Sequence, residues 1–396
     1  VQTAEGALTE VHSMLQRMNE LAVQSANGTN SSDDRQAIQD EVDQLTTEID
    51  RVAETTKFNE IYLLKGDNSN TKNVYMKGHD AGLKGTLTDG AKSATFTMDA
   101  LQAGDKYTIA GKEYTIGSAT TEVTALIDKA NTDATADTAN KTVDVNGKTY
   151  TITYNAAGNT IADADGTAIT LDDLKKAVTG GSKVTYGNTS LTAMTDADPD
   201  GVDDDDSSII TKDVAETKIK AELLTANNIG TVDQAATVED ANTANGKTSY
   251  TINKGYATVA DTLSFNLHVG ADADMTNKIT VDIDTMNSAN LGIKGINVKD
   301  ASGTEATYAI DAIADAVAKV SSQRSALGAV QNRLEHTIDN LDNISENTSS
   351  AESRIRDTDM AKEMVNYSKN NILAQAGQSM LAQANQSNQG VLSLLQ

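Results

Sequence analysis

The residues best placed to do chemistry are a run of aspartates, Asp196–Asp206. Aspartates alternate with other residues ahead of Gly201, which is how oxygen-rich calcium loops begin, because Ca²⁺ takes six to eight oxygen ligands and a glycine permits the sharp bend. The twelfth position is Ser207 instead of a glutamate, and Pro199 stiffens the loop. A solvated acidic surface loop is therefore favoured over a calcium site, and no metal is predicted.

Other catalytic signatures are missing from the sequence. The four histidines are far apart and none belongs to a His-Glu-x-x-His motif: His12, His79, His268 and His336. We find no phosphate loop, dinucleotide fingerprint or nucleophile elbow. The chain has no cysteine, which excludes disulfides and thiolate chemistry. We therefore predict no catalytic residue, no cofactor and no enzymatic activity.

The composition of the chain limits the classes of partner that it can bind. Acidic residues outnumber basic ones by 57 to 32, giving a formal charge of −25, which repels nucleic acid and anionic lipid. No apolar run approaches the ~18 residues of a membrane helix, and no signal peptide pattern is present. With 396 residues the chain is long enough for several domains, so the sequence predicts a multidomain protein that binds neither nucleic acid nor membrane.

Two helices are predicted at the start of the chain. Apolar residues recur every three or four positions, first at Val1, Ala4, Leu8, Val11, Leu15, Met18 and Ala22, and then at Ile38, Val42, Leu45, Ile49 and Val52. Asn27-Gly28 is expected to end the first helix in a left-handed cap, and Ser31, Ser32 and Asp33 can cap the second. The two helices are interpreted as a helical hairpin.

A longer helix with the same spacing is predicted far downstream. Its apolar positions are Ile310, Ile313, Val317, Val320, Leu327, Leu334, Ile338 and Leu341, with Arg324 and Gln331 interrupting the stripe. Such a stripe covers about 30 residues, or roughly 45 Å, and needs partner helices. Because the N-terminal hairpin offers two, we expect a bundle formed by both chain ends, with Leu15 and Leu334 in one packed body.

The interior, from about Tyr62 to Val298, has the habits of β structure. Three segments repeat a Gly-Lys turn ahead of a Tyr-Thr-Ile strand: Tyr107–Ile116, Val143–Ile152 and Asn245–Ile252. Short helices are expected at Val123–Lys129, Asp172–Val178 and Val214–Leu224. The interior is therefore predicted to be a β-rich α+β insert between helical arms.

A further hairpin is predicted just before the long helix. Alternating apolar residues place its strands at Phe265–Val269 and Ile279–Ile283, with the loop Gly270–Asn277 between them. We expect it to share a small sheet with Ile61–Leu64 and Val74–Met76.

The last 27 residues, Asn370–Gln396, contain no charged side chain. Ile372, Ala376, Met380, Ala384 and the ending Val391–Leu395 indicate a helix that is buried against other protein surfaces. The alternative is a disordered tail that becomes ordered on assembly.

These segments resemble the bacterial flagellins. The similar blocks are Leu15-Gln-Arg-Met-Asn-Glu-Leu-Ala-Val-Gln-Ser-Ala-Asn-Gly28, Ile38–Val52 with Phe58-Asn59, and Ile372–Leu395, in which Ala382-Gln-Ala-Asn385 and Val391-Leu-Ser-Leu-Leu395 are the most specific. The resemblance covers about 1–66 and 263–396. Flagellins begin with a further helical segment that pairs with the C-terminal helix, and a chain that begins at Val1 inside a helical pattern is expected to lack it.

The resemblance implies the following domains: a helical hairpin of the bundle at 1–60, a β segment at 61–89, a variable surface-exposed outer domain at 90–260, a returning β-hairpin at 261–300, a long bundle helix at 301–348 and an inner-core helix at 349–396. It also implies a secreted, extracellular subunit that polymerises into the flagellar filament. The implied partners are other flagellin subunits, an export chaperone and the cap and junction proteins.

The resemblance further implies recognition by a Toll-like receptor of animal innate immunity. The matching positions are Gln16, Arg17, Leu21 and Glu41, with Leu21 expected to be exposed, and Asn19 stands where the family commonly has a basic residue. The residues predicted to serve self-association are Leu8, Leu15, Val42, Ile49, Leu327, Leu334, Leu341, Ile372, Met380, Leu392 and Leu395.

Two other functions compete with the filament subunit. The Thr-rich insert suits a host-surface adhesin displayed on a helical stalk, and within the same structural class the chain suits a hook–filament junction protein. Self-association of the helical arms is expected of a filament subunit, whereas an adhesin would bind host surfaces through the insert without it.

Overall fold

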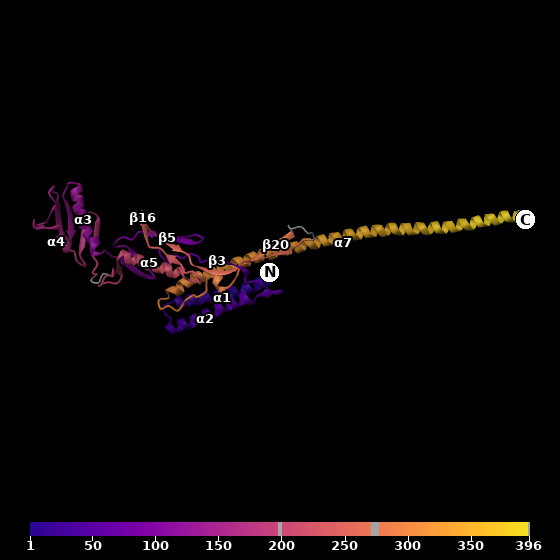
Figure 1. Ribbon diagram of the computed structural model, residues 1–396, viewed down its shortest axis with the longest axis horizontal. Coiled ribbons are helices and arrows are strands. Elements are labelled where there is room, and N and C mark those ends of the chain that lie inside the picture. Colours follow the sequence, from indigo (N-terminus) through magenta and orange to yellow (C-terminus); the bar gives the residue numbers. More distant parts are fainter. Residues whose placement is uncertain (197–199, 271–276, 395–396) are drawn as a thin grey trace. The chain divides into compact units, whose positions relative to one another are not determined.

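A computed structural model describes residues 1–196, 200–270 and 277–394 (Figure 1). The chain forms two compact units, Val1–Ser264 with Asp282–Ser325, and Phe265–Val281 with Ala326–Gln396. Helices occupy both chain ends, and the middle is rich in strands. The predicted fold class, a helical protein with a β-rich insert, is therefore confirmed.

Helices α1 (Gln2–Ala26) and α2 (Ser32–Thr55) form the predicted helical hairpin. Ser31 caps α2 through a reciprocal capping box with Asp34, as the sequence predicts. The left-handed cap predicted at Asn27-Gly28 is wrong, because Asn27 is extended with φ −75° and Gly28 does not have a positive φ. The Asn30 side chain instead donates hydrogen bonds to the carbonyls of Gln24 and Asn27, and this satisfies the last turn without a left-handed residue.

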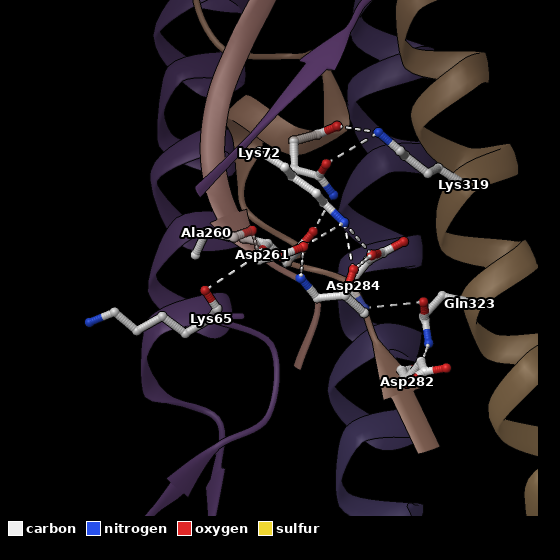
Figure 2. A network of polar contacts seen from close by, with 11 residues as sticks. Lys65, Lys72, Ala260, Asp261, Asp282, Asp284, Lys319 and Gln323 are labelled. Atoms are coloured by element: carbon white, nitrogen blue, oxygen red, sulfur yellow. Dashed lines mark hydrogen bonds and ion pairs between the residues drawn. The ribbon is translucent and has the colours of Figure 1, made fainter. Parts of the chain in front are cut away.

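Helix α7 (Thr304–Leu394) begins beside the end of α1, where Gly303 closely approaches the Ala26 backbone. In the first compact unit α1, α2 and the start of α7 lie side by side (Figures 1 and 2). The stripe of α7 is buried at Ile313, Val320 and Leu327.

Beyond Leu327 the stripe of α7 becomes open. Leu334 is half-buried, and Ile338 is 56% exposed. Leu15 belongs to the first compact unit and Leu334 to the second, so the prediction that they share one packed body is wrong. The reason is helix length: Leu334 lies 30 residues after Thr304 on α7, whereas the whole of α1 has only 25 residues.

The insert contains two β cores, and the proximal one includes two sheets. One sheet has the order β15-β17-β5-β4, with β16 beside β17, and the other has the order β14-β7-β6. Helix α5 (Lys212–Asn227) packs on both sheets, and Tyr308 of α7 enters the same core. The strands are β4 (Thr86–Asp89), β5 (Ser93–Asp99), β6 (Lys106–Ile109), β7 (Lys112–Ile116), β14 (Ile209–Ile210), β15 (Thr237–Val238), β16 (Asn242–Ala244) and β17 (Lys247–Asn253).

The distal core lies in the chain between β7 and β14. A sheet of order β11-β10-β9-β8-β12-β13 packs one face against α3 (Thr120–Ala136), and α4 (Leu171–Lys176) contacts α3. The chain enters and leaves side by side, since Met194 N donates to Ser118 O at 2.9 Å. The strands are β8 (Lys141–Val145), β9 (Lys148–Thr153), β10 (Thr160–Asp163), β11 (Ala168–Ile169), β12 (Lys183–Tyr186) and β13 (Thr189–Thr192).

All three predicted Gly-Lys hairpins are confirmed as β6–β7, β8–β9 and β16–β17. Each turns through two residues with positive φ, for example Asn146 at 55° and Gly147 at 79°, which is the conformation that favours Asn-Gly. The short helices expected in the insert are confirmed as α3, α4 and α5.

The remaining strands form three separate ribbons. β19 (Leu263–His268) pairs with β20 (Lys278–Ile283), which confirms the predicted hairpin, whose loop residues 271–276 lie outside the described residues. The small sheet expected to join it with Val74–Met76 is wrong, because β3 (Asp67–Tyr75) pairs with β18 (Tyr256–Asp261) instead. β1 (Lys57–Phe58) pairs only with β2 (Ile61–Tyr62), following α2.

Candidate functional site

A buried glutamine clamps the chain segment before α7 onto the helical hairpin. Gln39 of α2 is 7% exposed; its Nε2 donates to Ile296 O at 2.9 Å, and its Oε1 accepts from Val298 N at 2.7 Å. The buried Ser25 hydroxyl of α1 donates to the carbonyl of Val298. Both helices therefore fix the segment that leads through Asp300 and Gly303 into α7, and with it the start of that helix.

A second polar cluster joins α7 to the strands that return from the insert (Figure 2). Lys72 of β3 donates to Asp284 at 2.8 Å and to the Thr262 hydroxyl at 2.6 Å. Burial alone would raise the pKa of Asp284, but the hydrogen bonds from Lys72 and Thr262 outweigh it and hold that pKa below its ordinary value. The cluster thus pairs the half-buried Asp284 carboxylate with the Lys72 ammonium in the first compact unit.

Two side chains of α7 reach the same region. Lys319 donates to Asn290 O of α6 (Ser288–Leu291) at 2.5 Å, and burial lowers the pKa of Lys319. Gln323 accepts from Asp284 N at 3.4 Å and donates to Asp282 O at 2.9 Å. These contacts fix the start of α7 against the strands as the Gln39 clamp fixes it against the helices.

The predicted receptor residues lie along α1 and α2. Arg17 donates to Glu41 at 2.8 Å and to Glu20 at 3.2 Å, and the hydrogen bond with Glu41 raises the pKa of Arg17. Gln16 is exposed, but Leu21 is only 2% exposed, so the expectation that Leu21 is an exposed contact residue is wrong. Leu21 instead forms part of the floor of a groove between the two helices.

The predicted self-association residues divide into three groups. Buried within their own chain are Leu8, Leu15, Val42, Ile49 and Leu327. Leu334 and Leu341 are half-buried, whereas Ile372, Met380 and Leu392 of α7 are exposed. Leu395 lies outside the described residues. The first group stabilises the subunit itself, because a stripe that is buried within one chain has no surface left for a neighbour.

The carboxylates of the acidic loop accept hydrogen bonds from the backbone of the same region. Asp203 accepts hydrogen bonds from the backbone N–H groups of Thr195, Asp205 and Asp206, and Asp200 accepts from that of Val202. Asp198 and Pro199 lie outside the described residues. Within 1–196, 200–270 and 277–394, no group of three His, Asp or Glu side chains is arranged to hold a metal ion. The described part of the loop is therefore held by turns that its own carboxylates form.

Comparisons with known proteins give the family. The model of the bacterial flagellin N-terminal helical region matches residues 1–69, and that of the C-terminal helical region matches 310–395. A flagellin of Clostridium tyrobutyricum is 36% identical over 395 residues, covering 98% of this chain and 81% of that protein. The chain belongs to the bacterial flagellin family. It is thus a structural subunit of the flagellar filament.

Two other known proteins are similar to this chain. A flagellin of Salmonella rubislaw is 35% identical over 430 residues, covering 100% of this chain and 85% of that protein. The match to the solved structure of FliC from Burkholderia pseudomallei covers 84% of this chain and 97% of that one at 18% identity, with a TM-score of 0.32.

Sequence reasoning missed the polar contacts that fix α7 in this flagellin. Gln39 follows Ile38 and does not occupy a position of the apolar stripe of α2, so the pattern gives no sign that it is buried. Lys72 lies in a segment of mixed polarity. The partners of Gln39 are more than 250 positions away in the chain. The available signal is that glutamine and lysine occupy buried or half-buried positions, which becomes visible only once the fold is known.

Replacing Gln39 with leucine tests the clamp. Gln39→Leu leaves the buried Ile296 carbonyl and Val298 N–H without partners, so we expect the free energy of unfolding to fall by about 1–3 kcal/mol. The matched control is Gln36→Leu on the same helix, where an exposed amide donates to Asp40 at 2.8 Å and the expected loss is below about 0.5 kcal/mol. Equal losses in urea unfolding would contradict the clamp.

The Lys72 cluster predicts an acid-dependent stability. Asp284 has a lower pKa folded than unfolded, so its ionised form adds stability above the unfolded pKa of about 3.9, and that stability is lost as pH falls through the folded pKa. Lys72→Met is therefore expected to lower the melting temperature at neutral pH and to approach the parent chain in acid. Lys294→Met, an exposed control, should shift melting at neither pH. A constant Lys72→Met deficit at every pH would refute this role for Asp284.

Proposed function

We propose that this flagellin polymerises through the part of α7 that its own chain leaves open. The observation that supports the proposal is a long helix on which large apolar side chains face solvent, among them Ile355 at 66%, Ile372 at 65%, Met380 at 74% and Leu392 at 69%. Asn370–Gln396 carries no charge that would oppose burial. Apolar burial between copies supplies the free energy of assembly.

The division of labour along the chain is part of the proposal. Residues 1–60, 61–89, 261–300 and 301–348 build the bundle domain, 349–396 the inner helix, and 90–260 the outer domain. The outer domain faces solvent outside the cell, where its acidic surface keeps filaments apart. Within the described residues, no helix is both long enough and apolar enough to span a membrane.

The partners follow from assembly. Other copies of the chain are the main partner, joined by an export chaperone before assembly and by the cap and junction proteins at the filament ends. A Toll-like receptor would recognise the α1–α2 surface at Gln16, Arg17 and Glu41, where Arg17 is already held by Glu41 and binding must exchange that contact. We propose no enzymatic activity, cofactor or nucleic acid partner.

The other two functions receive less support. The relatives that match the whole chain at about 35% identity are named flagellins, which favours a filament subunit over a junction protein or an adhesin on a stalk.

Charge placed on α7 tests the polymerisation surface. Ile372→Asp and Met380→Asp put carboxylates on open side chains, so melting of the free chain should be unchanged, while growth on filament fragments, followed by electron microscopy, should be lost. The control is Val232→Asp, an isolated side chain in the insert that is 44% exposed, which should grow as the parent chain does. Normal growth of both α7 variants would show that this helix is not the assembly surface.

A further inference from the structure

Methionine supplies every sulfur atom of this chain, because the sequence has ten methionines and no cysteine. It also has no tryptophan, so the thioether sulfur is the side-chain atom that peroxides oxidise most readily here. A sulfur atom reacts only where the oxidant can reach it. The exposure of each methionine therefore decides where the chain can be oxidised.

The described methionines differ in exposure according to their place in the chain. Met360 is 59% exposed, Met364 63% and Met380 74%. The other described methionines are half-buried or buried: Met14, Met18, Met76, Met98, Met194 and Met286. Among the residues that the structure describes, every exposed methionine thus belongs to the distal part of α7.

The exposed methionines lie within the apolar surface that the chain leaves open on α7. Met360 and Met364 are one helical turn apart and are therefore neighbours on the helix. Met364 lines a shallow groove together with Val365 and Ile372, and Met380 follows about two turns further along α7. Each of these thioethers is part of the surface that assembly is proposed to bury.

Oxidation makes such a surface polar. A sulfur lone pair attacks one oxygen of a peroxide, the O–O bond breaks, an S–O bond forms and water leaves. The thioether is thereby oxidised to a sulfoxide while the peroxide is reduced. The flexible apolar side chain gains a strong hydrogen-bond acceptor, and burying that oxygen against an apolar neighbour is unfavourable unless a donor reaches it.

The folded core is shielded from the same reaction. Met18, Met98 and Met286 are at most 3% exposed and belong to the first compact unit. A peroxide that reaches the sulfur atoms of α7 therefore leaves the apolar core unchanged. Oxidation of the free chain consequently alters its assembly surface without unfolding it.

We propose that Met360, Met364 and Met380 are oxidation sites that control assembly, because a free copy whose three thioethers a peroxide has converted to sulfoxides no longer adds to the filament. This inference rests on the proposed function, since these side chains matter for growth only if distal α7 is the assembly surface. Methionine sulfoxide reductases convert sulfoxides back to thioethers, so the block is reversible.

Mass spectrometry of the oxidised chain tests the sites. The free chain is treated with dilute hydrogen peroxide, digested and mapped over time. We expect Met360, Met364 and Met380 to gain an oxygen at least about tenfold faster than Met18 and Met98, with melting of the chain unchanged. Equal rates at the exposed and the buried methionines would overturn the assignment of the sites.

Growth on filament fragments tests the consequence for assembly. The parent chain should elongate fragments at least about tenfold more slowly after peroxide, and a methionine sulfoxide reductase should restore its rate. The variant Met360→Leu/Met364→Leu/Met380→Leu keeps apolar side chains of similar volume, so peroxide should not change its own untreated rate.

A matched control replaces methionines outside α7. Met14→Leu/Met76→Leu leaves the three exposed thioethers in place, so peroxide should slow its growth as much as that of the parent chain. If peroxide slows the triple variant as much as the parent chain, growth is controlled by other residues and the inference is wrong.

The same measurements separate the inference from the proposed function. If the untreated parent chain grows and the chain carrying all three sulfoxides grows equally well, control by oxidation is wrong and the filament function stands. If the untreated parent chain fails to grow, the proposed function is wrong and the control of assembly falls with it, while the mapping by mass spectrometry still decides whether the three methionines are oxidation sites.

Discussion

Burial of the apolar stripe of α1 is the constraint on which the rest of the structure depends. Ala4, Leu8, Val11, Leu15 and Met18 are completely inaccessible, and a helix can hide such a stripe only where other elements cover it. α2 follows α1 after a short turn and covers one side of this stripe. The start of α7, some 300 positions away in the chain, must cover another side. Gln39 and Ser25 secure that distant return by binding the backbone just before α7.

The same constraint determines which surfaces stay open. Along α7 the apolar stripe is buried at Ile313, Val320 and Leu327, half-buried at Leu334 and Leu341, and exposed at Ile372, Met380 and Leu392. A subunit that satisfied all of its apolar surface internally would have no reason to polymerise. The division of one continuous helix between a covered and an open part therefore connects the stability of the chain to its assembly.

Periodicity predicted the helices, the three Gly-Lys hairpins and the insert well, because each depends on local spacing or on turn residues. Periodicity did not predict whether an apolar stripe is buried within its own chain or left exposed. Leu15 and Leu392 both belong to apolar helical patterns, yet Leu15 is buried in its own chain and Leu392 is exposed. Strand pairing between β3 and β18 and the hydrogen bonds of Gln39 were also beyond reach, since they join positions nearly 200 or more apart. The prediction that Leu21 is exposed was wrong because Leu21 lies at the bottom of the groove between α1 and α2, although Arg17, one helical turn away, is exposed.

Hydrogen exchange measured on the free chain and on the chain grown onto filament fragments tests the central claim most directly. The account predicts that amides of α1 and of α7 up to about Leu327 are protected in both states, while those of α7 beyond Ile338 exchange fast in the free chain and become protected in the polymer. Strong protection of distal α7 in the free chain, or fast exchange there in the polymer, would contradict the claim that assembly covers what the single chain leaves open.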